Sequence, residues 1–199
     1  MVDIGKLLVT DDYATSNDVN NNGMIVGKSA KGLDEKAFYW TQATGMVDIG
    51  TLGGESTSAR AVNDNGTIVG YSARNNGGMG AFFYTVGSGM IDIGTLGGTS
   101  AQAYDINNNG TIVGYSQNGS GSSNAFYWTE ATGMVNIHES GYSSSTATGV
   151  NDDGMIVGTR RIEGGNVVTS FYCTEATGMV DVEVLEGGTD VSANAIGKS

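Results

Sequence analysis

The feature that most constrains the fold of this chain is a nine-residue segment that occurs four times. It reads Val-Asn-Asn-Asn-Gly-Met-Ile-Val-Gly at residues 19–27 and returns, with small changes, at 62–70, 106–114 and 150–158. The first glycine of each copy lies 43, 44 and 44 residues after the previous one. A fixed period of this length is typical of repeat architectures, in which each repeat is one supersecondary unit.

A second block follows each copy of the first. Ala-Phe-Tyr-Trp-Thr at 37–41 leads to Met-Val-Asp-Ile-Gly at 46–50, and a Thr-Leu-Gly-Gly tail ends the unit at 51–54. The third repeat replaces this tail with His-Glu-Ser-Gly at 138–141, and the fourth has only a loose version at 185–188. We therefore predict a single repeat domain over residues 1–199 with partial repeats at 1–5 and 192–199. The four full repeats are predicted at about 14–54, 57–98, 101–141 and 145–188.

Each repeat has the pattern of four short strands. In the second repeat these are residues 58–63, 67–72, 81–85 and 90–96, which are rich in Val, Ile, Tyr, Phe and Thr. Asn-Gly and Asp-Gly pairs between the first two strands favour a tight hairpin whose glycine has a positive φ. The residues predicted to have this structural turn role are Gly23, Gly66, Gly110 and Gly154.

Four short strands every 44 residues or so indicate an all-β fold, most simply a β-propeller in which each repeat is one four-stranded blade. A β-solenoid or an open repeat array is the alternative. The solenoid is less favoured because its coils are usually shorter than this self-contained unit. No segment shows the apolar period of an amphipathic helix.

The repeat resembles the HAF-repeat family of probable extracellular proteins. Ala81-Phe82, the stretch Met90–Gly98 and the stretch Ala103–Gly114 match that family's pattern, and the resemblance covers nearly the whole chain. It implies a propeller-like fold and an extracellular or cell-surface location. One departure is that the family's histidine before Ala-Phe is absent from every copy; Gly80 and Asn124 stand there in the second and third repeats.

Composition narrows the classes of partner. The formal net charge is −12 with only nine Lys and Arg, whereas a nucleic-acid-binding protein is expected to carry a basic face. No apolar run is long enough for a membrane span, and the first 20 residues lack the pattern of a signal peptide. We expect neither nucleic acid nor membrane as a partner.

Residues that carry chemistry are few, and we predict no catalytic, cofactor-binding or metal-binding residues. The Asn-Asp-Asn-Gly turn at 63–66 resembles an acidic cation loop, but calcium takes about six to eight oxygens from a longer loop. His138 has no recurring nucleophile or carboxylate partner in the sequence, and Gly-Thr-Leu-Gly-Gly lacks the lysine of a phosphate loop. Cys173 stands where other repeats have an aromatic residue, which favours a small buried side chain.

These observations favour a non-enzymatic extracellular or surface repeat module with a structural or binding role. Its partner is then a glycan or another protein, or a further copy of the chain through terminal strands. A glycan-binding, lectin-like propeller is the first alternative, with Trp40, Tyr84 and Trp128 as candidate ligand-stacking residues. A hydrolase or lyase is the less favoured one.

The two ends of the chain generate the first prediction. Residues 1–5 match the last strand of a repeat and residues 192–196 match a first strand, and proteins normally cover unpaired strand edges. We expect the ends to meet within one chain. Deletion of residues 1–5 then gives a monomer with a lower denaturation midpoint, measured by light scattering and urea titration. A large species that dissociates to single chains on deletion indicates assembly through the ends, and a monomer of unchanged stability contradicts both interpretations.

Overall fold

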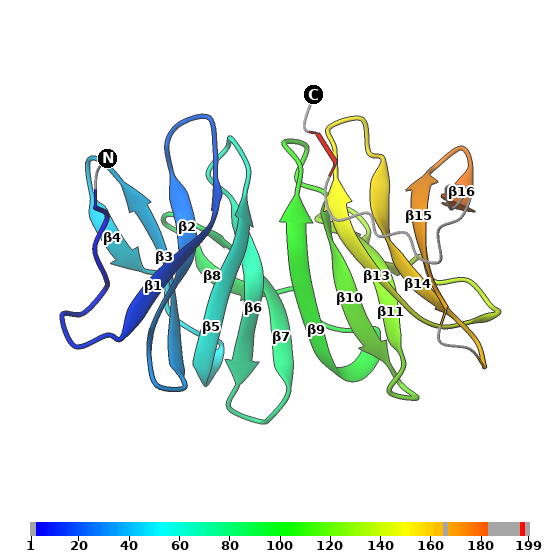
Figure 1. Cartoon of the computed structure of the whole chain (residues 1–199), viewed down its shortest axis with the longest axis horizontal. Helices are drawn as coiled ribbons and strands as arrows, with labels where there is room; N and C mark the ends of the chain where they lie inside the picture. The colour runs from blue at the N-terminus through cyan, green and yellow to red at the C-terminus, as the bar shows by residue number, and fades with distance from the viewer. Residues whose placement is uncertain (1–2, 165–166, 183–195, 198–199) are drawn as a thin grey trace. The chain divides into compact units, whose positions relative to one another are not determined.

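The computed structural model describes residues 3–164, 167–182 and 196–197, and within them it contains sixteen strands and no helix. Each repeat contributes four consecutive strands (Figure 1). The all-β class predicted from the sequence is confirmed. The strands of the first two repeats are β1 (Tyr13–Val19), β2 (Ile25–Lys31), β3 (Asp34–Thr41), β4 (Gly45–Asp48), β5 (Gly53–Val62), β6 (Ile68–Arg74), β7 (Met79–Thr85) and β8 (Gly89–Asp92). Those of the last two repeats are β9 (Gly97–Ile106), β10 (Ile112–Asn118), β11 (Ser123–Thr129), β12 (Gly133–Asn136), β13 (Tyr142–Val150), β14 (Ile156–Ile162), β15 (Val168–Thr174) and β16 (Gly178–Asp181).

Within every repeat the four strands pair antiparallel with their neighbours in sequence. The chain divides into two compact units, residues 1–94 and 95–199, each holding two repeats. In the first unit a parallel bridge between Glu35 and Ser56 joins the two repeats into one eight-stranded sheet. In the second unit β9–β12 and β13–β16 form separate four-stranded sheets.

The boundary between repeats differs from the predicted one. The sequence placed Thr-Leu-Gly-Gly at the end of the fourth strand. In the structure β4 ends at Asp48 and β8 at Asp92, and the next first strands, β5 and β9, begin at Gly53 and Gly97. The reason is a close approach of the first two strands: a Cβ added to Gly54 would lie 2.6 Å from the Ala73 Cβ. The preceding Leu52 amide donates to the Ser72 Oγ at 2.8 Å, which holds the link against the second strand.

Apolar side chains pack between the two repeats of each unit. In the first unit Ala37 and Tyr39 of β3 contact a cluster that includes Val62, Ile68 and Phe82 of the second repeat. The second unit has the equivalent cluster around Ala125, Ala147 and Phe171. One phenylalanine of each third strand is fully buried, so every repeat has the same large anchor: Phe38, Phe82, Phe126 and Phe171.

Within each unit, the first hairpin turns of the two repeats are joined by hydrogen bonds. These four turns (residues 20–23, 63–66, 107–110 and 151–154) each end in a glycine whose φ lies between 77° and 83°, the left-handed region. In the first unit the Asn21 amide and Nδ2 donate to the two carboxylate oxygens of Asp64, each at 2.9 Å. In the second unit Asn108 donates to Asp152 in the same way, at 2.8 and 3.0 Å.

The same interface is also bonded on either side of this pair. Asn20 donates from Nδ2 to the Asn63 carbonyl at 2.9 Å, and in the opposite direction the Val62 amide donates to Asp18 Oδ2, also at 2.9 Å. In the second unit Asn107 and Val150 make the equivalent bonds to the Asn151 carbonyl and to Asp105. The polar turns therefore hold one repeat in register with the next.

The terminal partial repeats fall largely outside the described residues. Residues 1–2 and 192–195 are among those not described, as is the loose tail at 185–188. Asp3, Ile4 and Gly5 are described and lie in no strand, which corrects the predicted strand at 1–5 for these three residues.

The turn-to-turn bonds give a direct test. Replacing Asp152 with Ala removes both acceptors of Asn108. A hydrogen bond to a charged group contributes up to about 3 kcal/mol to the free energy of unfolding. We expect a loss of about 1–3 kcal/mol in the free energy of unfolding, measured by urea denaturation. The matched control is Asp153→Ala, because Asp153 lies in the same turn with an exposed side chain. Equal effects of the two substitutions would contradict the role given to the turn bonds.

Candidate functional site

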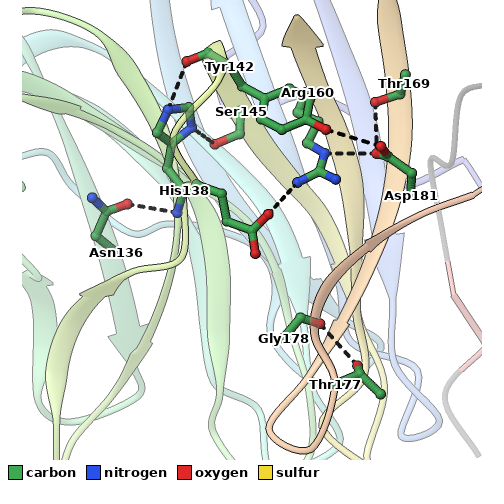
Figure 2. A network of polar contacts seen from close by, with 10 residues as sticks. Asn136, His138, Tyr142, Ser145, Arg160, Thr169, Thr177, Gly178 and Asp181 are labelled. Atoms are coloured by element: carbon green, nitrogen blue, oxygen red, sulfur yellow. Dashed lines mark hydrogen bonds and ion pairs between the residues drawn. The ribbon is translucent and has the colours of Figure 1, made fainter.

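The site with the most unusual chemistry lies where the repeat pattern breaks between the third and fourth repeats. Two earlier links read Gly-Thr-Leu-Gly-Gly at 50–54 and 94–98, but residues 138–142 read His-Glu-Ser-Gly-Tyr. On β14, Arg160 occupies the position of the buried serines Ser29, Ser72 and Ser116. These changes bring His138, Glu139, Tyr142 and Arg160 together in what we call the polar cluster (Figure 2).

Arg160 is the centre of the cluster. Its side chain is only 5% exposed, and it donates from Nε to Asp181 Oδ1 and from Nη1 to Glu139 Oε2, both at 2.8 Å. The guanidinium carbon lies 3.9 Å from the centre of the Tyr142 ring, within the range of a cation–π contact. A buried cation is stable only when it is paired, and here two carboxylates and a ring face it.

Asp181, the last residue of β16, collects three donors. Besides Arg160 it accepts the Thr169 hydroxyl at 3.0 Å and the Tyr142 hydroxyl at 3.1 Å. The hydrogen bond from Arg160 is the main reason why the pKa of Asp181 lies below its usual value. The pKa of Tyr142 is raised, by burial first and then by its bond to Asp181. The cluster thus stabilises the ionised form of Asp181 and the neutral form of Tyr142.

His138 is held through both ring nitrogens. Nε2 lies 3.1 Å from the Tyr142 carbonyl oxygen, which only accepts, so Nε2 donates to it, and Nδ1 lies within hydrogen-bond distance of Ser145 Oγ at 2.8 Å. A Ser–His pair at this distance has the geometry of an activated nucleophile. Ser145, however, is only 2% exposed and its oxygen also accepts the Ala125 amide at 2.9 Å, so a substrate has no access to it.

Sequence reasoning missed this cluster. It treated His138 as having no partner that recurs in the repeat, and Ser145 does not recur: Thr57 and Ala101 stand at its position. The usable signal was the break in the pattern at 138–142 together with an arginine where a serine recurs.

The carboxylates that end the fourth strands behave alike in one respect: each bonds within its own repeat, as Asp92 does with Arg74 at 2.7 and 2.8 Å.

The candidate stacking residues occupy equivalent positions on β3, β7 and β11. Trp40, Tyr84 and Trp128 are all half-buried. The Tyr84 ring packs against Tyr39, with ring centroids 6.3 Å apart, and its counterpart in the fourth repeat is Cys173. Trp40 and Tyr84 belong to the first unit and Trp128 to the second.

Comparisons with known proteins bear on the fold alone. No protein-family model matches the sequence, and no curated protein matches it. A solved structure of TolB from Acinetobacter baumannii is similar, with a TM-score of 0.66 and 17% identity over 92% of this chain. The fold is propeller-like. The chain spans about half the length of TolB, since the match covers 47% of that structure. At this identity the likeness carries no statement about function.

The turn carboxylates generate a prediction about metals. Asp64 and Asp152 each accept two bonds from the neighbouring turn, one on each carboxylate oxygen, so a cation would compete with these bonds. Among the described residues no group of three His, Cys, Asp or Glu is placed to hold a metal ion. We expect EDTA to leave the melting temperature unchanged, as measured by differential scanning fluorimetry. A melting temperature that rises with added calcium would contradict this interpretation of the turns.

The polar cluster generates a prediction about pH. Because the pKa of Asp181 is lower in the folded chain than in the unfolded chain, its carboxylate stabilises the fold above the unfolded value of about 3.9. That contribution is lost as the pH falls below about 3.9 towards the folded pKa. The difference in unfolding free energy between the parent and Asp181→Asn should be constant from about pH 5 to 8 and shrink below about pH 4.

The matched control for this pH series is Asp48→Asn. Asp48 ends the fourth strand of the first repeat and accepts the Gly50 amide at 2.8 Å. Urea denaturation of both variants across pH 3–8 separates the ion pair from the turn bond. A parent–variant difference at Asp181 that grows towards low pH would show that Arg160 does not depress its pKa.

Proposed function

We propose that this chain is a non-enzymatic extracellular or surface repeat module, whose four repeats form the blades of a propeller and whose role is structural or binding. The observation that carries the proposal is that the polar residues which break the repeat bind one another. Arg160 faces Glu139 and Asp181, and both ring nitrogens of His138 have partners. Catalytic groups need access to a substrate, and the Ser145 hydroxyl next to His138 has none.

The organisation of each unit also supports a scaffold role. The same anchors recur in both units, namely the buried phenylalanine of each third strand and the bonded hairpin turns. Repeat proteins of this kind derive their stability from contacts between neighbouring repeats, and their outer surfaces are then free to vary. The acidic character, a net charge of −12, favours neutral or cationic partners over nucleic acid.

The location is part of the proposal and rests on the resemblance to the HAF-repeat family. It is tested with an antibody against the chain, applied to intact cells of the source organism and to the culture medium. Signal from intact cells or medium is expected. Signal that appears only after lysis would overturn the extracellular location and leave the binding role untouched.

The activity is tested by combining binding with product analysis. A glycan array and a peptide array are probed with the purified chain. The bound ligands are then recovered, and their molecular masses are measured by mass spectrometry. We expect the ligands to keep their mass. Time-dependent product formation that Glu139→Gln or His138→Ala abolishes would overturn the non-enzymatic proposal. A glycan signal lost in Trp40→Ala and Trp128→Ala would select the lectin-like role.

A further inference from the structure

A half-open cavity of about 470 Å³ lies in the second unit, between the third and fourth repeats. Thr111 and Tyr127 of the third repeat form one side, and Asp153, Cys173 and Glu175 of the fourth repeat form the other. This volume is in the range of pockets that take small molecules, about 300–1,000 Å³. The cavity does not include the polar cluster described above.

The equivalent place in the first unit contains larger side chains. Met24 stands at the position of Thr111, directly after the turn glycine, and Tyr84 stands at the position of Cys173 on the third strand. A Cβ added to Gly66 would lie 3.8 Å from the Met24 Cε, and the Tyr84 ring contacts Tyr39. Two shortened side chains, one on each side of the interface, therefore leave space in the second unit that the first unit fills.

The charge of this place also differs between the units. Asp153 stands where the second repeat has Asn65, and Glu175 stands where it has Val86. The described residues that line the cavity include both carboxylates and no lysine or arginine. The second unit thus gains two negative charges at the rim of the space that it leaves open, and these charges favour a cationic ligand.

The inner walls are aromatic and aliphatic. Ile137 and Ile156 line the cavity together with Tyr127, and organic cations are attracted to the face of an aromatic ring. Burial raises the pKa of the Cys173 thiol, and the Glu139 carboxylate acts in the same direction, so the thiol stays neutral. A bare metal ion fits poorly, because no described group of three His, Cys, Asp or Glu is placed to hold one.

We propose that this cavity binds a small organic cation: an ammonium group held by Asp153 and Glu175, on an apolar body that packs against Tyr127 and the two isoleucines. The inference rests on the binding role proposed above and names the class of ligand. A free amine and a lysine side chain of a partner carry the same ammonium chemistry, so the experiment includes both.

The experiment is a titration followed by NMR at pH 7 and low salt with three probes of similar shape. Phenethylammonium carries the positive charge, 2-phenylethanol is neutral, and 3-phenylpropionate is negative. We expect phenethylammonium to bind at least about tenfold more tightly than the alcohol, with the carboxylate weakest, and the preference to shrink at high salt. N-acetyl-lysine methylamide is the fourth probe. Tighter binding of phenethylammonium indicates a free amine as the ligand, and tighter binding of the lysine compound indicates a lysine side chain of a partner.

Three variants connect the binding to the cavity. The double substitution Asp153→Asn with Glu175→Gln should weaken phenethylammonium at least about tenfold and leave the alcohol unchanged. Cys173→Tyr restores the residue of the second repeat and should abolish binding of both probes. Glu130→Gln is the matched control. Glu130 is the third-repeat counterpart of Glu175, in the same position of the turn, and it does not line the cavity.

The NMR spectrum and melting temperature of each variant verify that it is folded. Equal affinities for the three probes, no binding at millimolar concentration, or binding that survives Cys173→Tyr would each overturn the proposed site. These outcomes do not affect the non-enzymatic proposal. A ligand recovered with a changed mass would overturn the non-enzymatic proposal, but the proposed binding site would still be supported if the cation is preferred.

Discussion

The arrangement of each unit depends on the hydrogen bonds between successive hairpin turns. Apolar packing brings two repeats together, but it is nearly non-directional, so a slide along the strands costs little by itself. The bidentate contact of Asn21 with Asp64, and of Asn108 with Asp152, has only one satisfying geometry. It fixes which residue of one repeat lies opposite which residue of the next, and the buried phenylalanines and the Tyr39–Tyr84 contact follow from that register.

The polar cluster shows what happens when one link departs from the common pattern. In the second repeat a serine, Ser72, accepts the amide of the incoming link, and Leu52 covers the space beside it. In the fourth repeat Arg160 replaces the serine, which places a charge in a buried position. Glu139 and Tyr142 belong to the same link: Glu139 and Asp181 form ion pairs with Arg160, and the Tyr142 ring lies against its guanidinium. Arg160 depends on these partners, because its side chain is buried and a buried charge without a partner is costly.

The sequence predicted the strands well inside the repeats, where the same residue types recur, and poorly at the links between repeats. The hairpin at 63–66 follows from residue type alone, because the turn needs a glycine and short polar neighbours. The start of β5 at Gly53 does not, since Thr-Leu-Gly-Gly reads equally well as the end of one strand. The cavity was beyond sequence reasoning for another reason. It arises from the volumes of Thr111 and Cys173, which are far apart in the chain and meet only across an interface.

The alternation of the turns has a consequence for how such a chain grows. The second turn position is Asn in the first and third repeats and Asp in the second and fourth, so the donor and the acceptor lie on different kinds of repeat. Two adjacent repeats of the acceptor kind would set carboxylate against carboxylate, and two of the donor kind would leave amide hydrogens without an acceptor. A duplication that copied a single repeat would create one of these mismatches, whereas copying a pair would not. The pair of repeats, rather than the single repeat, is therefore the smallest unit that can be copied without such a mismatch.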